Sequence, residues 1–196
     1  AAAGRDEVAR LVQQARDGPF VNDRLVVEEL RQPNDGEQPI AGMDAGLARP
    51  FDPTLVPLPD GRVRLYFTSN RNADFRRSVP AIYSAISSDA IRYVFEPGVR
   101  FGLEGRVAID CAVALRDGVF HLIVPDNGTP DDLAAADARS APARGGTGYH
   151  AVSRDGLVFE RLADVSLPGG DRWLGNLISD DGRLVLSRSY AYFEDG

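Results

Sequence analysis

The chain has 196 residues, of which 43% are hydrophobic and 26% are charged, and its formal net charge is −7. This acidic balance argues against the clustered basic face on which nucleic-acid-binding proteins depend, so we expect no nucleic-acid partner. The sequence also lacks the run of about 18 apolar residues that a membrane-spanning helix needs, and we expect no membrane span.

The first fifty residues predict a short helix and one added strand. Val8, Leu11 and Val12 recur at helical spacing within residues 5–15. Residues 24–30 (RLVVEEL) are apolar enough for a strand. We therefore interpret residues 1–50 as an N-terminal helix followed by a capping or ring-closing segment. The chain opens with Ala-Ala-Ala-Gly and without Met, which is consistent either with a trimmed end or with the small residues left after signal cleavage. On the second alternative we expect a secreted or periplasmic protein.

Three β-hairpins are predicted in the rest of the chain, at residues 51–68, 109–125 and 174–190. Each joins two apolar segments through a polar turn that ends in Asp-Gly, and this dipeptide readily supplies the positive φ angles of a tight hairpin. The turn glycines are Gly61, Gly118 and Gly182. Their spacing of roughly 60 residues suits a repeat of one four-stranded unit.

The second half of each complete unit repeats as well. Residues 85–89 and 151–155 both read Ala-x-Ser-x-Asp and precede a segment that carries aromatic residues. Four short strands per repeat are typical of a β-propeller blade, although a β-sandwich with similar hairpins is the alternative. We predict an all-β fold: a β-propeller over residues 51–196, with two complete blades and a third begun. The propeller is then only partly covered by this chain, or residues 1–50 supply further strands.

Two aspartates stand at equivalent places in successive units, Asp52 before the first inner strand and Asp110 before the second. In a propeller these positions converge on one mouth of the central channel. Paired carboxylates on one concavity serve glycoside hydrolysis, in which one activates water or attacks carbon and the other protonates the leaving oxygen. The alternative is structural, because an aspartate at a strand head also caps turns by accepting backbone N–H bonds.

On these residues the chain resembles the five-bladed propeller glycosidases of the arabinanase and β-xylosidase group, family 43. The resemblance implies that Asp52, followed by Pro53, is the general base, and that Asp110 tunes the pKa of the acid and orients the substrate. The segment SRDGLVF, residues 153–159, is similar to the outer-strand turn of that family. The family's general acid is a glutamate at the head of the third inner strand.

That glutamate is missing from the corresponding segment, residues 172–176, which reads RWLGN. Asp171 just upstream and Glu104 in the connection between the first two units are possible substitutes. The missing glutamate puts hydrolytic activity in doubt but leaves the prediction of the fold unchanged.

Further side chains are candidates for substrate binding. Arg71, Phe75 and Arg76 lie in a long loop whose guanidinium forks and aromatic ring suit sugar hydroxyls and ring faces, unless the loop is merely solvated. Trp173 is either a stacking platform for a sugar or packing between blades. His150, like His121, lies in an apolar segment and is either a ligand or a structural histidine.

We expect no metal site and no cofactor, because the sequence has neither the spacing of metal ligands nor a phosphate-binding glycine loop. The leading hypothesis is a glycoside hydrolase-like protein that acts on poly- or oligosaccharides by carboxylate acid/base catalysis. The alternative is a non-catalytic propeller that binds carbohydrate or a protein partner, since one fold hosts many functions.

Overall fold

The computed structural model describes residues 40–72, 74–135, 147–166, 172–180 and 183–190. All of these residues belong to one unit of the chain, residues 39–196. They form β-strands with a single six-residue helix, so the prediction of an all-β chain is confirmed for the described part. The helix predicted at residues 5–15 and the strand predicted at residues 24–30 lie outside it.

Sheet 1 is formed by the first five strands, in the order β1-β5-β4-β3-β2. These strands are β1 (Ile40–Ala41), β2 (Phe51–Pro57), β3 (Val63–Ser69), β4 (Ala81–Ser87) and β5 (Tyr93–Phe101). Strands β2 to β5 form an antiparallel meander, and β1 pairs in parallel with β5 at the outer edge. The first predicted hairpin is the β2–β3 pair, and Gly61 in its turn has φ +84°.

Sheet 2 repeats the antiparallel part of this arrangement with β6 (Ala112–Arg116), β7 (Val119–Pro125), β8 (Thr147–Ser153), β9 (Glu160–Arg161) and β10 (Val165–Ser166). Both β9 and β10 pair with β8. The helix α3 (Pro130–Ala135) follows β7 and was not predicted from the sequence. It begins with a capping box at Thr129, the residue before Pro130. The Asp132 carboxylate accepts the backbone N–H of Thr129, and the Thr129 hydroxyl oxygen accepts the backbone N–H of Asp132.

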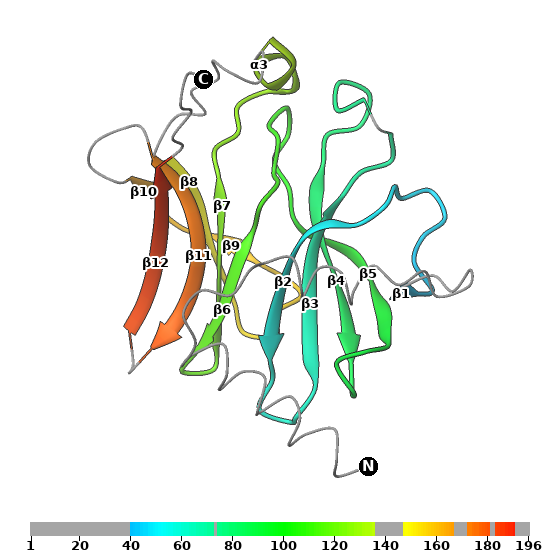
Figure 1. The fold of residues 1–196 in the computed structure, drawn as a ribbon, viewed down its shortest axis with the longest axis vertical. Coiled ribbons are helices and arrows are strands. Elements are labelled where there is room, and N and C mark those ends of the chain that lie inside the picture. Colours follow the sequence, from blue (N-terminus) through cyan, green and yellow to red (C-terminus); the bar gives the residue numbers. More distant parts are fainter. Residues whose placement is uncertain (1–39, 73, 136–146, 167–171, 181–182, 191–196) are drawn as a thin grey trace, which may run out of the picture. The chain divides into compact units, whose positions relative to one another are not determined.

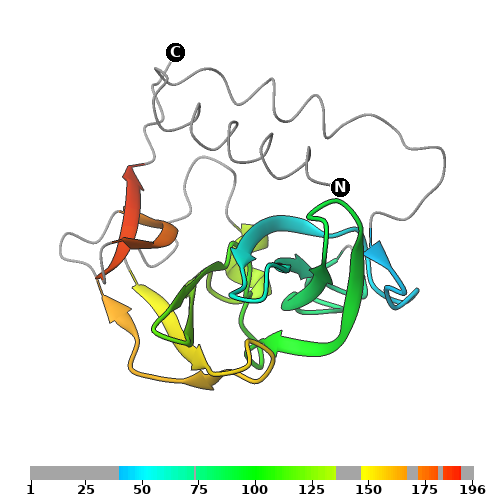
Figure 2. The same ribbon diagram turned by 90° about the horizontal axis from the view of Figure 1, so that it is seen from below.

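Sheet 3 is the hairpin of β11 (Arg172–Asp180) and β12 (Arg183–Tyr190). The arrows of β2, β6 and β11 all point downward in Figure 1, so the three strands begin at the upper end, where α3 also lies. Figure 2 shows the sheets following one another from sheet 1 to sheet 3. Strand β6 contacts β2 on one side and β11 on the other. The three innermost strands are therefore neighbours.

Two apolar layers hold the sheets face to face. Between sheets 1 and 2, the side chains of Tyr66, Ile82 and Leu122 are fully buried, and burial of each contributes about 1.5–3 kcal/mol. Between sheets 2 and 3, Ile123 packs with Leu174 among the buried residues of the second cluster. Alternation along β6 and β7 thus sends side chains into both layers, so this part of sheet 2 is buried on both faces.

A turn of sheet 2 is anchored in sheet 1 by side chains that point out of β3. Arg64 donates a hydrogen bond of 2.7 Å from Nη1 to the carbonyl oxygen of Asp155, and it also pairs with Glu96 at 2.9 Å. The hydroxyl of Tyr66 donates to the carbonyl oxygen of Gly156 at 2.9 Å. A Cβ atom at Gly156 would lie 2.2 Å from Nη1 of Arg64 and 2.6 Å from the hydroxyl oxygen of Tyr66, so a side chain there would force these hydrogen-bonded groups to shift.

The equivalent turn of sheet 1 has the same local chemistry. Ser87 donates from Oγ to the Asp89 carboxylate, which also accepts the backbone N–H groups of Ile91 and Arg92. These backbone hydrogen bonds lower the pKa of Asp89 to about 2. The position of Gly156 is taken in sheet 1 by Ala90, which is exposed and has φ +61°. Asp89 and its counterpart Asp155 are thus turn-capping residues.

Candidate functional site

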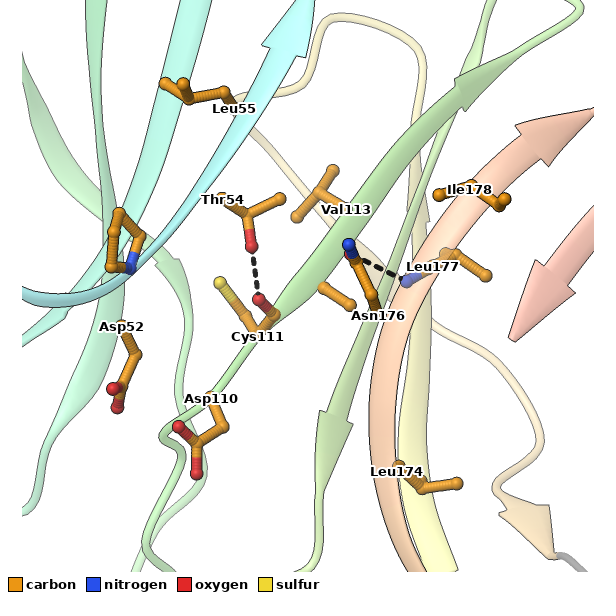
Figure 3. A pocket seen from close by; sticks show the side chains of 12 residues that line it. Asp52, Thr54, Leu55, Asp110, Cys111, Val113, Leu174, Asn176, Leu177 and Ile178 are labelled. Atoms are coloured by element: carbon orange, nitrogen blue, oxygen red, sulfur yellow. Dashed lines mark hydrogen bonds between the residues drawn. The ribbon is translucent and has the colours of Figure 1, made fainter. Parts of the chain in front are cut away.

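A cavity of about 600 Å³ is bordered by the three innermost strands. Its lining comes from the first halves of these strands: Asp52, Pro53, Thr54 and Leu55 of β2; Asp110, Cys111, Ala112 and Val113 at the start of β6; and Leu174, Asn176, Leu177 and Ile178 of β11. Figure 3 shows both aspartates at one end of this cavity, with Leu55, Val113 and Ile178 toward the other end. The cavity therefore has a carboxyl end and an apolar end.

Both aspartates have a left-handed backbone conformation. The φ angle is +50° at Asp52 and +59° at Asp110. Aspartate is among the few non-glycine residues that accept this region, at a cost of about 1–2 kcal/mol. In β2 the pairing register shifts between Phe51 and Thr54, which marks a β-bulge around Asp52. A β-bulge changes the direction of a side chain relative to the regular alternation of the strand, and bulges are frequent beside active sites. The bulge at Asp52 therefore changes the direction in which this carboxylate points.

The two carboxyl groups interact directly. Asp110 is half-buried, and its pKa is raised to about 7, first by burial and then by a hydrogen bond with Asp52 and by the charge of that residue. A carboxyl group with this pKa keeps its proton over much of the range in which an ordinary aspartate has lost it. Asp110 can therefore donate that proton in a hydrogen bond to the Asp52 carboxylate.

A hydrogen bond between sheets 1 and 2 lies beside this pair. The hydroxyl of Thr54 donates to the carbonyl oxygen of Cys111 at 2.6 Å, as the dashed line in Figure 3 shows. Cys111 itself is buried, and burial raises the pKa of its thiol to about 12, so the thiol stays protonated. Cys111 is thus a small packing residue and no nucleophile.

The third strand contributes no acid to the described lining. Leu174 is buried against sheet 2, and the side chain of Asn176 accepts a hydrogen bond from the backbone N–H of Leu177 at 3.0 Å. Trp173 lies on β11 directly before Leu174, but its side chain is outside the described part. Of the two substitutes considered for the missing glutamate, Asp171 is also outside it, and Glu104 is an exposed residue of the turn before β6.

The predicted arginine loop is held to its neighbours by ion pairs. Arg71 pairs with Asp44 at 2.6 Å, and Arg76 pairs with Asp131 of α3 at 2.6 Å. Phe75 stacks on Phe51, with ring centroids 6.4 Å apart and planes 8° from parallel. None of the three predicted loop residues is among the described lining of the cavity, but Phe75 contacts the residue that precedes Asp52.

His150 lies in a different place from the aspartates. Nε2 of His150 is 3.2 Å from Nδ1 of His121, and the two rings stack with centroids 5.4 Å apart. The register of β7 and β8 puts both side chains on the face that also carries Ile123, which packs toward sheet 3. Burial lowers the pKa of each imidazole, and at His121 the charge of His150 lowers it further. The structure brings together a histidine pair that the sequence did not predict.

Among the described residues, no group of three or more His, Cys, Asp or Glu side chains is arranged to hold a metal ion. No described helix is long and apolar enough to cross a membrane.

Comparison with known proteins gives matches at the level of three-dimensional structure. A family 117 glycoside hydrolase of Zobellia galactanivorans matches with a TM-score of 0.52 and 15% identity, over 75% of this chain and 49% of that one. A β-1,2-mannobiose phosphorylase of Listeria innocua, in complex with β-1,2-mannobiose, matches with a TM-score of 0.50 and 10% identity, over 80% of this chain and 56% of that one. The chain has a propeller-like fold similar to that of these two proteins.

The chain spans about half the length of these two structures, 49% and 56%. No family model matches the sequence. No curated protein matches it either. The resemblance to the solved structures is therefore one of fold, and it supports the coarse part of the sequence-based interpretation, a propeller-like protein related in structure to glycoside-processing enzymes.

Proposed function

We propose that the cavity binds a carbohydrate and that Asp52 acts there as the general base in hydrolysis of a glycosidic bond. The observation that carries this proposal is the meeting of Asp52 and Asp110 at one end of the cavity, each from the head of an innermost strand and each with a left-handed backbone. Two strained residues of the same type at repeated positions favour a selected function, because strain of this kind concentrates at active sites.

The pair acts as one unit in this mechanism. Acid and base on opposite sides of a glycosidic bond stand roughly 5–10 Å apart, whereas Asp52 and Asp110 are in hydrogen-bonding contact. A proton on Asp110 leaves Asp52 as the carboxylate and fixes its orientation. Asp52 then takes a proton from water, the water oxygen attacks the anomeric carbon, and the bond to the leaving oxygen breaks. The proton for that oxygen comes from another group.

Within this proposal the sheets belong to a five-bladed propeller, of which sheets 1 and 2 are complete blades and sheet 3 begins a third. The successive antiparallel sheets and their shared cavity support this arrangement. Phe75 and Arg76, near the head of β2, are the proposed contacts for further sugar units. A polysaccharide substrate agrees with the secreted or periplasmic location expected from the sequence.

A binding module is the second candidate, and one observation favours it. The described lining of the cavity has two carboxylates, in contact with each other, and Asn176 on the strand where a separate acid is expected. Such a site can hold sugar hydroxyls by hydrogen bonds without cleaving the bond, because general acid catalysis of an unactivated glycoside needs its own proton donor.

The experiment compares turnover of aryl glycosides and of natural oligosaccharides by the purified protein and by Asp52→Asn. An aryl leaving group needs little protonation, so we expect aryl glycosides to be cleaved faster. Asp52→Asn should lower this rate about 100- to 10,000-fold, the range for loss of a general base. The matched control is Asp117→Asn, since Asp117 is an exposed turn residue that also has a positive φ, +50°.

Three outcomes separate the candidates. Cleavage that is lost in Asp52→Asn and kept in Asp117→Asn supports the hydrolase. Binding of an oligosaccharide in calorimetry, with no cleavage of either substrate class and with affinity unchanged in Asp52→Asn, decides for the binding module. Neither binding nor cleavage of any glycoside tested contradicts both candidates.

A further inference from the structure

The heads of β2 and β6 are held together by one side chain in particular. The two strands belong to different sheets, so the described ladders do not join them. The Thr54 hydroxyl crosses between them to the carbonyl oxygen of Cys111, 2.6 Å away. Thr54 is two residues after Asp52, and Cys111 directly follows Asp110. The hydrogen bond therefore ties together the two short segments that carry the aspartates (Figure 3).

Each of these segments needs external support. Left-handed backbone costs a non-glycine residue about 1–2 kcal/mol, and both Asp52 and Asp110 have such backbone. Asp52 also lies in a bulge, where the regular ladder of β2 and β3 is interrupted. Threonine suits the task, because its branched Cβ restricts χ1 and so fixes the direction of the hydroxyl.

We propose that Thr54 is a positioning residue, whose hydrogen bond to the Cys111 carbonyl holds the Asp110 carboxyl group against that of Asp52. The inference rests on the proposed function only in taking this pair as the reacting unit. Thr54 touches no reacting atom in this role; it acts by fixing the distance between the heads of β2 and β6.

Loss of the hydroxyl has a defined effect on the pair. Thr54→Val keeps the branched shape but leaves the Cys111 carbonyl without this partner, and so removes the hydrogen bond that fixes the distance between the two strand heads. The contribution of Asp52 to the pKa of Asp110 weakens, while the contribution of burial remains. Asp52 is the charged group that raises this pKa; the described lining of the cavity has no histidine or arginine to oppose it. The pKa of Asp110 should therefore fall part of the way from about 7 toward 3.8.

The test is a titration of the aspartate carboxyl groups by NMR, with the Asp110 signal assigned from Asp110→Asn. We expect the Asp110 pKa to fall by about one pH unit or more in Thr54→Val, since a hydrogen bond and a nearby charge each act on this scale. Thr54→Ser keeps the hydroxyl and should restore the wild-type titration. If Thr54→Val does not fold, Thr54→Ala is titrated in its place, with the same expected fall.

Tyr66→Phe is the matched control. It removes a hydrogen bond of the same kind, from a hydroxyl of sheet 1 to a carbonyl oxygen of sheet 2, at Gly156 instead of Cys111. It should lower stability without moving the Asp110 pKa. An unchanged Asp110 pKa in the threonine variants, or an equal fall in Tyr66→Phe, overturns the inference. The titration needs no substrate, so it gives this answer even if the protein cleaves no glycoside.

Discussion

Replacement of Asp110 by asparagine should make the folded protein more stable at alkaline pH. Asparagine accepts the left-handed φ of +59°, and its amide can donate a hydrogen bond to Asp52 as the protonated acid does. Asp110→Asn thus imitates the protonated carboxyl group and cannot ionise. In wild type, by contrast, ionisation of Asp110 above its pKa of about 7 places a second negative charge beside Asp52.

The magnitude follows from the pKa of Asp110. A rise from 3.8 to about 7 corresponds to about 4 kcal/mol if the whole difference acts on folding, at about 1.4 kcal/mol per pH unit. Asp110 is only half-buried, and water screens a charge in that position, so we take about half, about 2 kcal/mol. The folded pKa is raised, so wild-type stability is retained below about pH 4 and falls as the pH rises toward 7.

Urea unfolding at pH 4 and at pH 8 measures this. Asp110→Asn should exceed wild type by about 2 kcal/mol in the free energy of unfolding at pH 8 and by nearly nothing at pH 4, and the gain at pH 8 raises Tm by about 4–8 °C. Asp117→Asn, in an exposed turn, should match wild type at both values. The reasoning is refuted if Asp110→Asn is no more stable than wild type at pH 8, or if its advantage is the same at both pH values.

Two further predictions concern the layers between the sheets. Gly156→Ala should lower the free energy of unfolding by about 2–4 kcal/mol, because its Cβ would meet Nη1 of Arg64 at 2.2 Å at a φ of +72°. Gly118→Ala has nearly the same φ, +73°, with nothing within 4 Å, so it should cost only about 1–2 kcal/mol; equal losses in urea unfolding would contradict the crowding argument. His150→Gln should make stability less sensitive to acid. The pKa values of His150 and His121 are lowered in the folded state, so wild type loses stability as the pH falls below 6.5, and an unchanged slope between pH 7 and pH 5 would contradict this.

The hairpins were predictable because their turns carry local chemistry. Asp-Gly at Gly61 and Gly118 specifies the turn without help from the rest of the chain, and both glycines have positive φ in the structure. The all-β fold and the order of the strands follow from such local signals, repeated at a regular spacing. The helix α3 has a local signal as well, Thr129-Pro130 with Asp132, but it is hidden in a loop rich in small residues.

The site was predictable in part. The equivalence of Asp52 and Asp110 follows from the repeat, whereas their direct contact depends on a bulge and on left-handed backbone that no short motif specifies. The role inferred for Thr54 depends on how β2 packs beside β6, a relation between sheets. The pair of His121 and His150 arises from the register of β7 and β8, and a shift by one residue would have turned one ring to the other face.

The turns at Ala90 and Gly156 differ in whether another sheet packs against them. Both residues have nearly the same backbone, φ +61° and +72°, which glycine adopts freely and alanine does not. At residue 156 a methyl group would lie 2.2 Å from Nη1 of Arg64 and 2.6 Å from the hydroxyl oxygen of Tyr66, so glycine avoids a clash that another residue would make there. Ala90 is exposed, and its methyl group is tolerated there at the cost of strain. The same turn thus lies in two different surroundings. Side chains of sheet 1 pack around residue 156 and disfavour a side chain there, whereas residue 90 is exposed to solvent and a methyl group is tolerated.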